Sequence, residues 1–140
     1  MLANIYNQTV TILNKLKRTD GITGVDVWYK TVLHDVAWYT DSARSAGGSS
    51  VYIGTYIKVF IPFHDEYLPY MEWKKLGNQD THFTVSTGDY VVLGEVTEDI
   101  TADNVVKTMQ KYGENVCLVR HHNENYNRFG ARVQLKIEGV

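Results

Sequence analysis

The feature that most constrains this chain is a stretch that holds both of its prolines and is followed at once by a second strand-like run. Residues Tyr56–Leu76 read YIKVFIPFHDEYLPYMEWKKL, and residues His82–Val96 read HFTVSTGDYVVLGEV. Pro62 ends or edges a β-branched run, because proline lacks the amide hydrogen that a central strand requires. Pro69 stiffens an aromatic turn, so the region predicts a strand, an ordered connection and another strand.

Length and charge set the limits of the fold. The 140 residues predict a single domain, 1–140, that needs neither a disulfide nor a metal to fold. The formal charge of -2 argues against a nucleic-acid binder with a dominant basic face. Cys117 is the only cysteine, which predicts a reducing compartment and, from its apolar neighbours, a buried thiol. No secretion signal or membrane-spanning run is visible, so we expect a soluble chain without a membrane partner.

The apolar pattern predicts a mainly β fold with one short α-helix inserted before the last two strands. The interruption at His34-Asp35 indicates either one long bent strand or two short ones. The helix is expected at residues 101–112, where Val105, Val106 and Met109 face one side and Gly113 ends the helix. Strands are expected at residues 8–17, 26–33, 36–40, 51–63, 82–96, 115–120 and 132–138.

A small, polar, glycine-rich segment is expected to form a long, flexible and exposed loop between early strands. Gly47-Gly48 is not followed by a lysine and a hydroxyl residue, so no phosphate-binding loop is indicated there. The loop consists of Asp41, Ser42, Ala43, Arg44, Ser45, Ala46, Gly47, Gly48, Ser49 and Ser50.

The histidines show no metal-ligand spacing, so no metal or other cofactor is predicted. They are His34, His64, His82, His121 and His122. His121 and His122 are adjacent in an expected strand, where neighbouring side chains point to opposite faces. We therefore expect one of the two to point inward and the other toward solvent.

No catalytic residue is assigned, and the chain is interpreted as a non-enzyme. An acid and base pair could be drawn from several carboxylates, but solvated loop charges explain the same positions. These carboxylates are Asp65, Glu66, Glu72, Glu95, Glu98 and Asp99. Thr87-Gly88-Asp89 is interpreted as a tight turn, in which glycine supplies a positive φ and Asp89 accepts hydrogen bonds from turn amides.

Aromatic residues are numerous, with ten tyrosines and three tryptophans. Such amphipathic side chains suit packing in a core or turn, a subunit interface, or stacking on nucleic-acid bases, the last of which lacks a supporting basic groove. The candidate subunit-interface residues are Tyr67, Tyr70 and Trp73. Replacing Trp73 or Tyr70 with alanine is expected to damage either folding or subunit assembly.

The order of several segments points to a family. The segments are TVTILNKLK, WYKTVLHDVAW, KVFIPF with LPYMEW, FTVSTGDYVVLGEV with an acidic TED and the short helix, and RFGARVQLKIEG. Together they resemble small minor capsid proteins of tailed phages, and more narrowly the head-closure, or head-tail stopper, class. The resemblance covers nearly the whole chain, and its motifs are structural.

The resemblance implies a head-closure-like barrel that forms a homo-oligomeric ring, a hexamer, in the neck of the virion. Such a ring closes the portal and adaptor channel, retains packaged DNA and presents a docking surface for the tail. The implied partners are the head-tail adaptor protein, the tail terminator protein and packaged double-stranded DNA in the channel. Assembly would take place in the host bacterial cytoplasm. The loop at 41–50 is a candidate for lining the channel or contacting the adaptor, although Asp41 and Arg44 are its only charged residues.

Two alternatives stay open. A tail terminator or another neck protein of the same assembly would share the size and location of a stopper. A small β-barrel ligand-binding module would instead contain a preformed apolar pocket.

Overall fold

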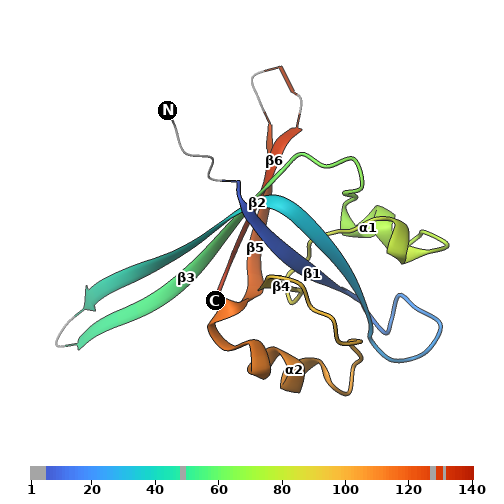
Figure 1. Ribbon diagram of the computed structural model, residues 1–140, viewed down its shortest axis with the longest axis horizontal. Coiled ribbons are helices and arrows are strands. Elements are labelled where there is room, and N and C mark those ends of the chain that lie inside the picture. Colours follow the sequence, from blue (N-terminus) through green and yellow to red (C-terminus); the bar gives the residue numbers. More distant parts are fainter. Residues whose placement is uncertain (1–5, 48–49, 127–128, 131) are drawn as a thin grey trace.

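A computed structural model describes residues 6–47, 50–126, 129–130 and 132–140, with the backbone alone at 41–47, 50–55 and 132–133. Six antiparallel strands form a closed barrel in the order β1-β2-β3-β6-β5-β4, which confirms the predicted mainly β barrel (Figure 1). The strands are β1 (Gln8–Leu16), β2 (Val27–Gly47), β3 (Ser50–Pro62), β4 (Tyr90–Leu93), β5 (Val116–Tyr126) and β6 (Arg132–Gly139).

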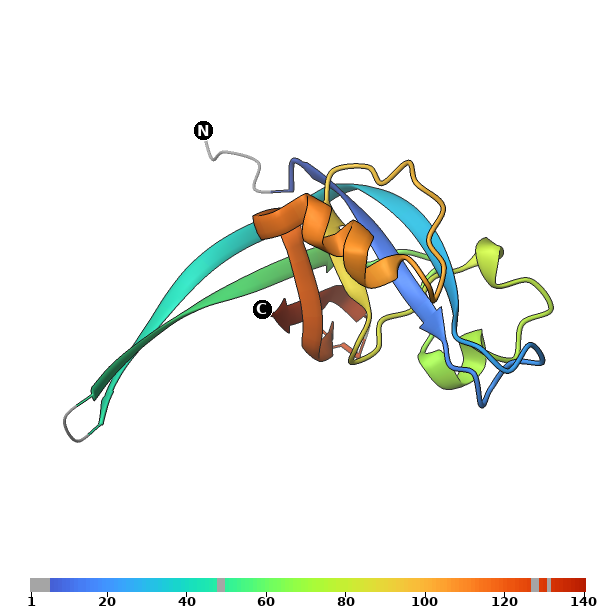
Figure 2. The same cartoon turned by 90° about the horizontal axis from the view of Figure 1, so that it is seen from below.

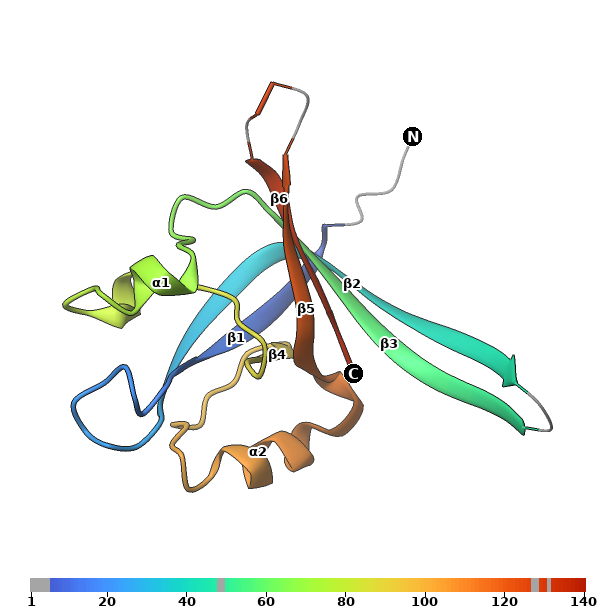
Figure 3. The same cartoon turned by 180° about the vertical axis from the view of Figure 1, so that it is seen from behind.

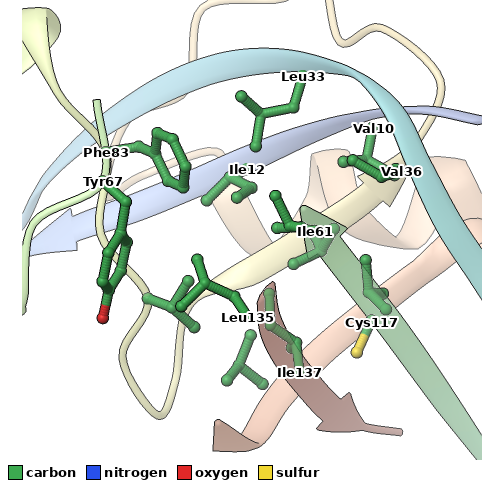
Figure 4. Close-up of a cluster of buried hydrophobic side chains, with 14 of the residues drawn as sticks. Val10, Ile12, Leu33, Val36, Ile61, Tyr67, Phe83, Cys117, Leu135 and Ile137 are labelled. Carbon is green, nitrogen blue, oxygen red and sulfur yellow. The ribbon is translucent and has the colours of Figure 1, made fainter. Parts of the chain in front are cut away.

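Apolar side chains from all six strands fill the barrel (Figure 4). Val10 and Ile12 of β1 and Ile137 of β6 are fully buried there. Cys117 is buried among them, as predicted, and this burial raises the pKa of its thiol to about 12. The thiol is therefore a packing group and not a nucleophile at neutral pH.

The first strand is buried on both faces, which explains its imperfect alternation. Val10 and Ile12 face the barrel core, whereas Leu13 belongs to a second cluster with Val92 and Met109. This second cluster lies beneath helix α2 (Val105–Tyr112), which Figure 2 shows alongside the barrel. A strand covered on both sides needs apolar residues at successive positions, so period-two alternation is lost.

The region around His34-Asp35 belongs to one long bent strand. Asp35 has φ 60, a left-handed conformation that aspartate tolerates better than most residues. On one side of this bend β2 pairs with β1, and from Ala37 onward it pairs with β3. The bend therefore transfers β2 from one neighbour to the other.

Beyond the barrel, β2 and β3 continue as a two-stranded arm, here defined as residues 41–47 and 50–56 (Figures 1 and 3). The predicted loop does join the second and third strands, but most of its described backbone is strand. Asp41–Gly47 belong to β2 and Ser50 to β3, whereas Gly48 and Ser49 lie outside the described residues. The strands extend this far because their register runs without a shift from Ala37↔Phe60 to Gly47↔Ser50.

The predicted helix forms at Val105–Tyr112 and ends at Gly113, which has φ 59. Val105 and Met109 are buried, but Val106 is 60% exposed, so the prediction that it shares their face is wrong. Successive helical residues are about 100° apart around the axis, and that rotation turns Val106 toward solvent.

The proline-containing connection contains a helical turn that the sequence did not predict. Helix α1 (Tyr70–Trp73) begins immediately after Pro69, whose φ of -57 is already helical. The Gln79 side chain donates to the carbonyl oxygen of Leu76 at 2.7 Å and so caps the end of this turn. The following run contributes only Tyr90–Leu93 as a strand, β4, because Ser86 to Asp89 make a turn in which Gly88 has φ 96.

Candidate functional site

Two of the three aromatic residues predicted to form a subunit interface, Tyr67 and Trp73, are buried within the single chain. Tyr67 is 4% exposed and Trp73 is fully buried. The Tyr67 ring lies 5.8 Å from the Phe83 ring, and Trp73 Nε1 donates to the carbonyl oxygen of His82 at 3.0 Å. The structure therefore leaves neither side chain exposed to a neighbouring subunit, because Tyr67 packs in the barrel core and Trp73 is buried against the backbone of His82.

Tyr70 is half-buried and links helix α1 to the β1–β2 connection. Its hydroxyl donates to Asp20 Oδ2 at 2.6 Å and accepts from the Lys17 amide at 3.3 Å. Burial, reinforced by the hydrogen bond to Asp20, raises the pKa of Tyr70 to about 12. Lys74 completes the cluster with an ion pair to Asp20 at 3.3 Å. This arrangement is a structural clasp, with part of the Tyr70 ring still accessible.

An apolar groove lies where the base of the arm, helix α2 and the end of β6 meet. Its volume is about 840 Å³, and its lining residues include Trp38, Ile57, Leu93, Val106, Met109 and Val140. Val106 and Val140 are 60% and 50% exposed. The sequence did not predict this groove, because its walls come from segments about a hundred positions apart that only the barrel brings together.

His121 and His122 are both exposed, so the prediction of one inward histidine is wrong. A register shift between Val119 and His121 marks a β-bulge in β5, and the strand beyond it extends past the packed interior as a hairpin with β6 (Figure 1). His122 pairs with Ile137 but lies beyond the part of β5 that the core covers. Within the described residues, no group of three or more histidine, cysteine or carboxylate side chains could hold a metal ion.

The carboxylates considered as acid and base candidates are not brought together. Asp65, Glu66, Glu72, Glu95 and Asp99 are exposed. Glu98 accepts a hydrogen bond of 2.6 Å from the Tyr112 hydroxyl, and this bond lowers the pKa of its carboxyl. Glu98 thereby fastens the preceding loop to helix α2.

Asp89 is a buried carboxylate that accepts three hydrogen bonds. It accepts from the Ser86 amide at 3.0 Å, as the turn interpretation predicts, and also from the Lys15 amide and Asn14 Nδ2. Burial nevertheless raises the pKa of Asp89 to about 6. Its partners are all structural, so Asp89 joins β1 to the turn before β4.

Among the described helices, none has the length and apolar character needed to cross a membrane. Searches of curated proteins and of solved structures found no match to the chain. A family model described as a family of unknown function, DUF6751, matches residues 5–140. The match spans the barrel, the arm and both helices, and the chain therefore belongs to the DUF6751 family.

Proposed function

We propose that this chain is a structural protein of the tailed-phage neck, a head-tail stopper. In this proposal copies of the chain form a ring, a hexamer, between the head-tail adaptor and the tail terminator. The ring closes the channel, retains packaged double-stranded DNA and provides the surface to which the tail docks. Its place in the virion is the head-tail interface, and it assembles in the host bacterial cytoplasm.

The observation that carries the proposal is the arm on a small closed barrel. The barrel is complete in one chain, since every strand pairs with two neighbours. Seven residues of β2, Asp41–Gly47, lie beyond the last β3 residue that pairs with β6. At about 3.3 Å per strand residue, the arm reaches about 20 Å past the barrel wall. Arms that point toward the axis of a ring would narrow its channel.

The arm also favours assembly over a monomeric role. Residues 41–47 pair only with β3, and residues 50–56 only with β2, among the strand partners that the structure describes. An isolated two-stranded ribbon is marginally stable in water, and its free edges are templates for further pairing. A ring supplies neighbours to every arm, and identical subunits with head-to-tail contacts close such a ring without leaving an end.

The location of the chain in particles tests the proposal. Filled heads from a tail-less mutant should carry the chain as a ring beneath the adaptor, visible by electron cryo-microscopy. Depleting the chain should give heads that lose DNA to added nuclease. A chain found only on tails from a headless mutant would make it a tail terminator instead.

The apolar groove supports a second candidate function, a small β-barrel ligand-binding module. Its volume of about 840 Å³ falls within the range of small-molecule sites. Native mass spectrometry of the purified chain would then show a retained small molecule. Loss of that molecule in Val106→Lys, with an unchanged circular dichroism spectrum, would favour this function over the stopper, because Val106 lines the groove and is exposed.

A further inference from the structure

A polar recess of about 480 Å³ lies on the β5–β6 side of the barrel, apart from the arm and the apolar groove. Its lining residues include Thr87, Arg120, His121, His122, Lys136 and Glu138. They come from the turn before β4, from β5 just past its bulge, and from β6. The recess is thus a product of the closed barrel and belongs to none of the surfaces described above.

Backbone hydrogen bonds fix the floor of this recess. The Gly88 amide donates to the carbonyl oxygen of Val119 at 3.0 Å, and the Val119 amide donates to that of Asp89 at 2.9 Å. The Thr87 hydroxyl donates to the carbonyl oxygen of Arg120 at 3.3 Å. The turn and the bulged strand are therefore held together where Arg120 and the two histidines emerge, which reduces the cost of ordering these side chains around a ligand.

Cationic and donor groups outnumber the acid in the recess. Glu138 contributes the carboxylate, and its Oε1 lies 2.9 Å from Lys136 Nζ. The hydrogen bond from Lys136 is the largest effect that lowers the pKa of Glu138, with smaller electrostatic contributions from Lys58 and His121. Arg120 adds an uncompensated positive charge. A positive excess at one place is notable in a chain whose formal charge is -2.

The side chains of Arg120, His121 and His122 have free hydrogen-bonding capacity. Each residue is exposed, and none of the three side chains makes a hydrogen bond or ion pair to another residue in the described ranges. An arginine guanidinium presents paired donors that match the oxygens of a phosphate group. Lys136 on the neighbouring strand β6 and the His121 imidazole on β5 add point donors.

We propose that this recess binds a phosphate group, either as a free ion or on a nucleic-acid backbone. Arg120 is the principal anchor, Lys136 and His121 supply further donors from the face that they share with Glu138, and Glu138 weakens binding by repulsion while orienting Lys136. The proposed phosphate site is present in the isolated chain and does not require a ring. Its test is therefore independent of the test of the neck function.

Nuclear magnetic resonance titration of the full chain tests the proposal at constant ionic strength. Inorganic phosphate should shift the amide signals of residues 119–123 and 136–138 along a saturating curve. A short DNA duplex forms the second arm of the experiment. Saturation by phosphate alone indicates a free ion, whereas saturation by duplex alone indicates the backbone, and either result supports the site.

Charge variants separate a binding site from general electrostatics. Arg120→Gln should weaken binding about tenfold, as expected for loss of a charged hydrogen bond, and Glu138→Gln should strengthen binding. Lys107→Gln removes a charge from the exposed face of α2 and is the matched control, with binding unchanged. Circular dichroism verifies that each variant is folded.

Three results would overturn the proposal. The first is a linear, unsaturated response equal to that seen with chloride. The second is equal weakening by Arg120→Gln and Lys107→Gln, which would show only a general charge effect. The third is tighter binding of a glutamate-rich peptide than of either phosphate source, because the recess would then be a carboxylate-binding surface.

Discussion

Asn14 and Asp89 form a buried hydrogen bond of 2.9 Å that joins β1 to the turn preceding β4. Asn14 also donates to the carbonyl oxygen of Thr84 at 2.6 Å and accepts from its amide at 3.2 Å. A polar side chain inside an apolar strand is costly unless all its groups are paired. Here the pairing fixes the position of the segment that leads into β4.

The buried Asp89 predicts that the chain becomes less stable as pH rises toward neutrality. Burial raises the pKa of Asp89 from 3.8 to about 6, so the folded state binds more protons than the unfolded state between these values. The free energy of unfolding should therefore fall as pH rises through this window, by at most about 3 kcal/mol. Urea unfolding at several pH values measures this slope.

Asp89→Asn is the reference for that experiment, because asparagine does not titrate. The difference in unfolding free energy between the two proteins should change with pH across the window and be flat above it. Carboxylates with a lowered pKa, such as Glu138, make the free energy of unfolding rise with pH. They are present in both proteins, so their contribution cancels in the difference. Parallel pH profiles for the two proteins would contradict the prediction.

Gly139 should tolerate no side chain. A Cβ atom there would meet the carbonyl oxygen of Leu118 and lie 2.6 Å from Cys117 Sγ. Because Gly139 pairs with both Ile57 of β3 and Val119 of β5, neither neighbouring strand can move aside alone. We expect Gly139→Ala to cost about 3 kcal/mol or to prevent folding, measured by thermal unfolding.

Gly77 provides the matched control for Gly139. Nothing lies within 4 Å of a Cβ atom built at this position, and its φ is not positive. Gly77→Ala should leave the unfolding midpoint unchanged or raise it slightly, since it restricts the unfolded chain. Equal losses in the two variants would show that the close approach at Gly139 is not the cause.

Trp73 should act through folding before any assembly step. Its side chain is fully buried, so Trp73→Ala should lower the free energy of unfolding by about 3–5 kcal/mol. Tyr70→Phe should cost about 1–2 kcal/mol, because it removes only the hydroxyl that Asp20 accepts from. Met71→Ala, in the same helical turn but 61% exposed, is the control. A Trp73→Ala monomer of normal stability with failed assembly would contradict this role.

The arm should be dispensable for folding and required for DNA retention. Replacing residues 43–54 with Asn-Gly joins Ser42 to Thr55, which are already paired, through a two-residue turn that suits a hairpin. We expect an unchanged thermal midpoint and particles that release DNA to nuclease. Particles that retain DNA with the shortened arm would remove the arm from the proposed function.

Most of the strands could be predicted because they are long enough for apolar spacing to be visible, whereas closure into a barrel was expected only from the family resemblance. Ile57, Val59 and Ile61 alternate and point into the core as expected, and Gly113 ends the helix as expected. The turn at Gly88-Asp89 was also recognisable, because positive φ and a side chain that accepts from the Ser86 amide are local features.

Other features depend on contacts that no local pattern encodes. The paired arm was predicted as a loop, because serine, alanine and glycine carry little strand propensity and the register of the adjacent ladder decides their conformation. The bulge in β5 and the extension of this strand beyond the core, where His122 is exposed, depend on its pairing with β6. Burial of Trp73 depends on a fold-back onto His82. The pairing of Asn14 with Asp89 joins residues 75 positions apart, so the turn at Asp89 was recognisable but its buried partner was not.

The strand order also governs how the chain can fold. β6 lies between β3 and β5. One edge of β3 and one edge of β5 therefore stay unpaired until β6, the last strand of the chain, has formed. During synthesis the three-stranded meander β1-β2-β3 therefore emerges with an open edge. Closure depends on pairing between residues such as Ile57 and Gly139, and long-range pairing of this kind slows folding. A chain truncated before β6 should aggregate through those two edges.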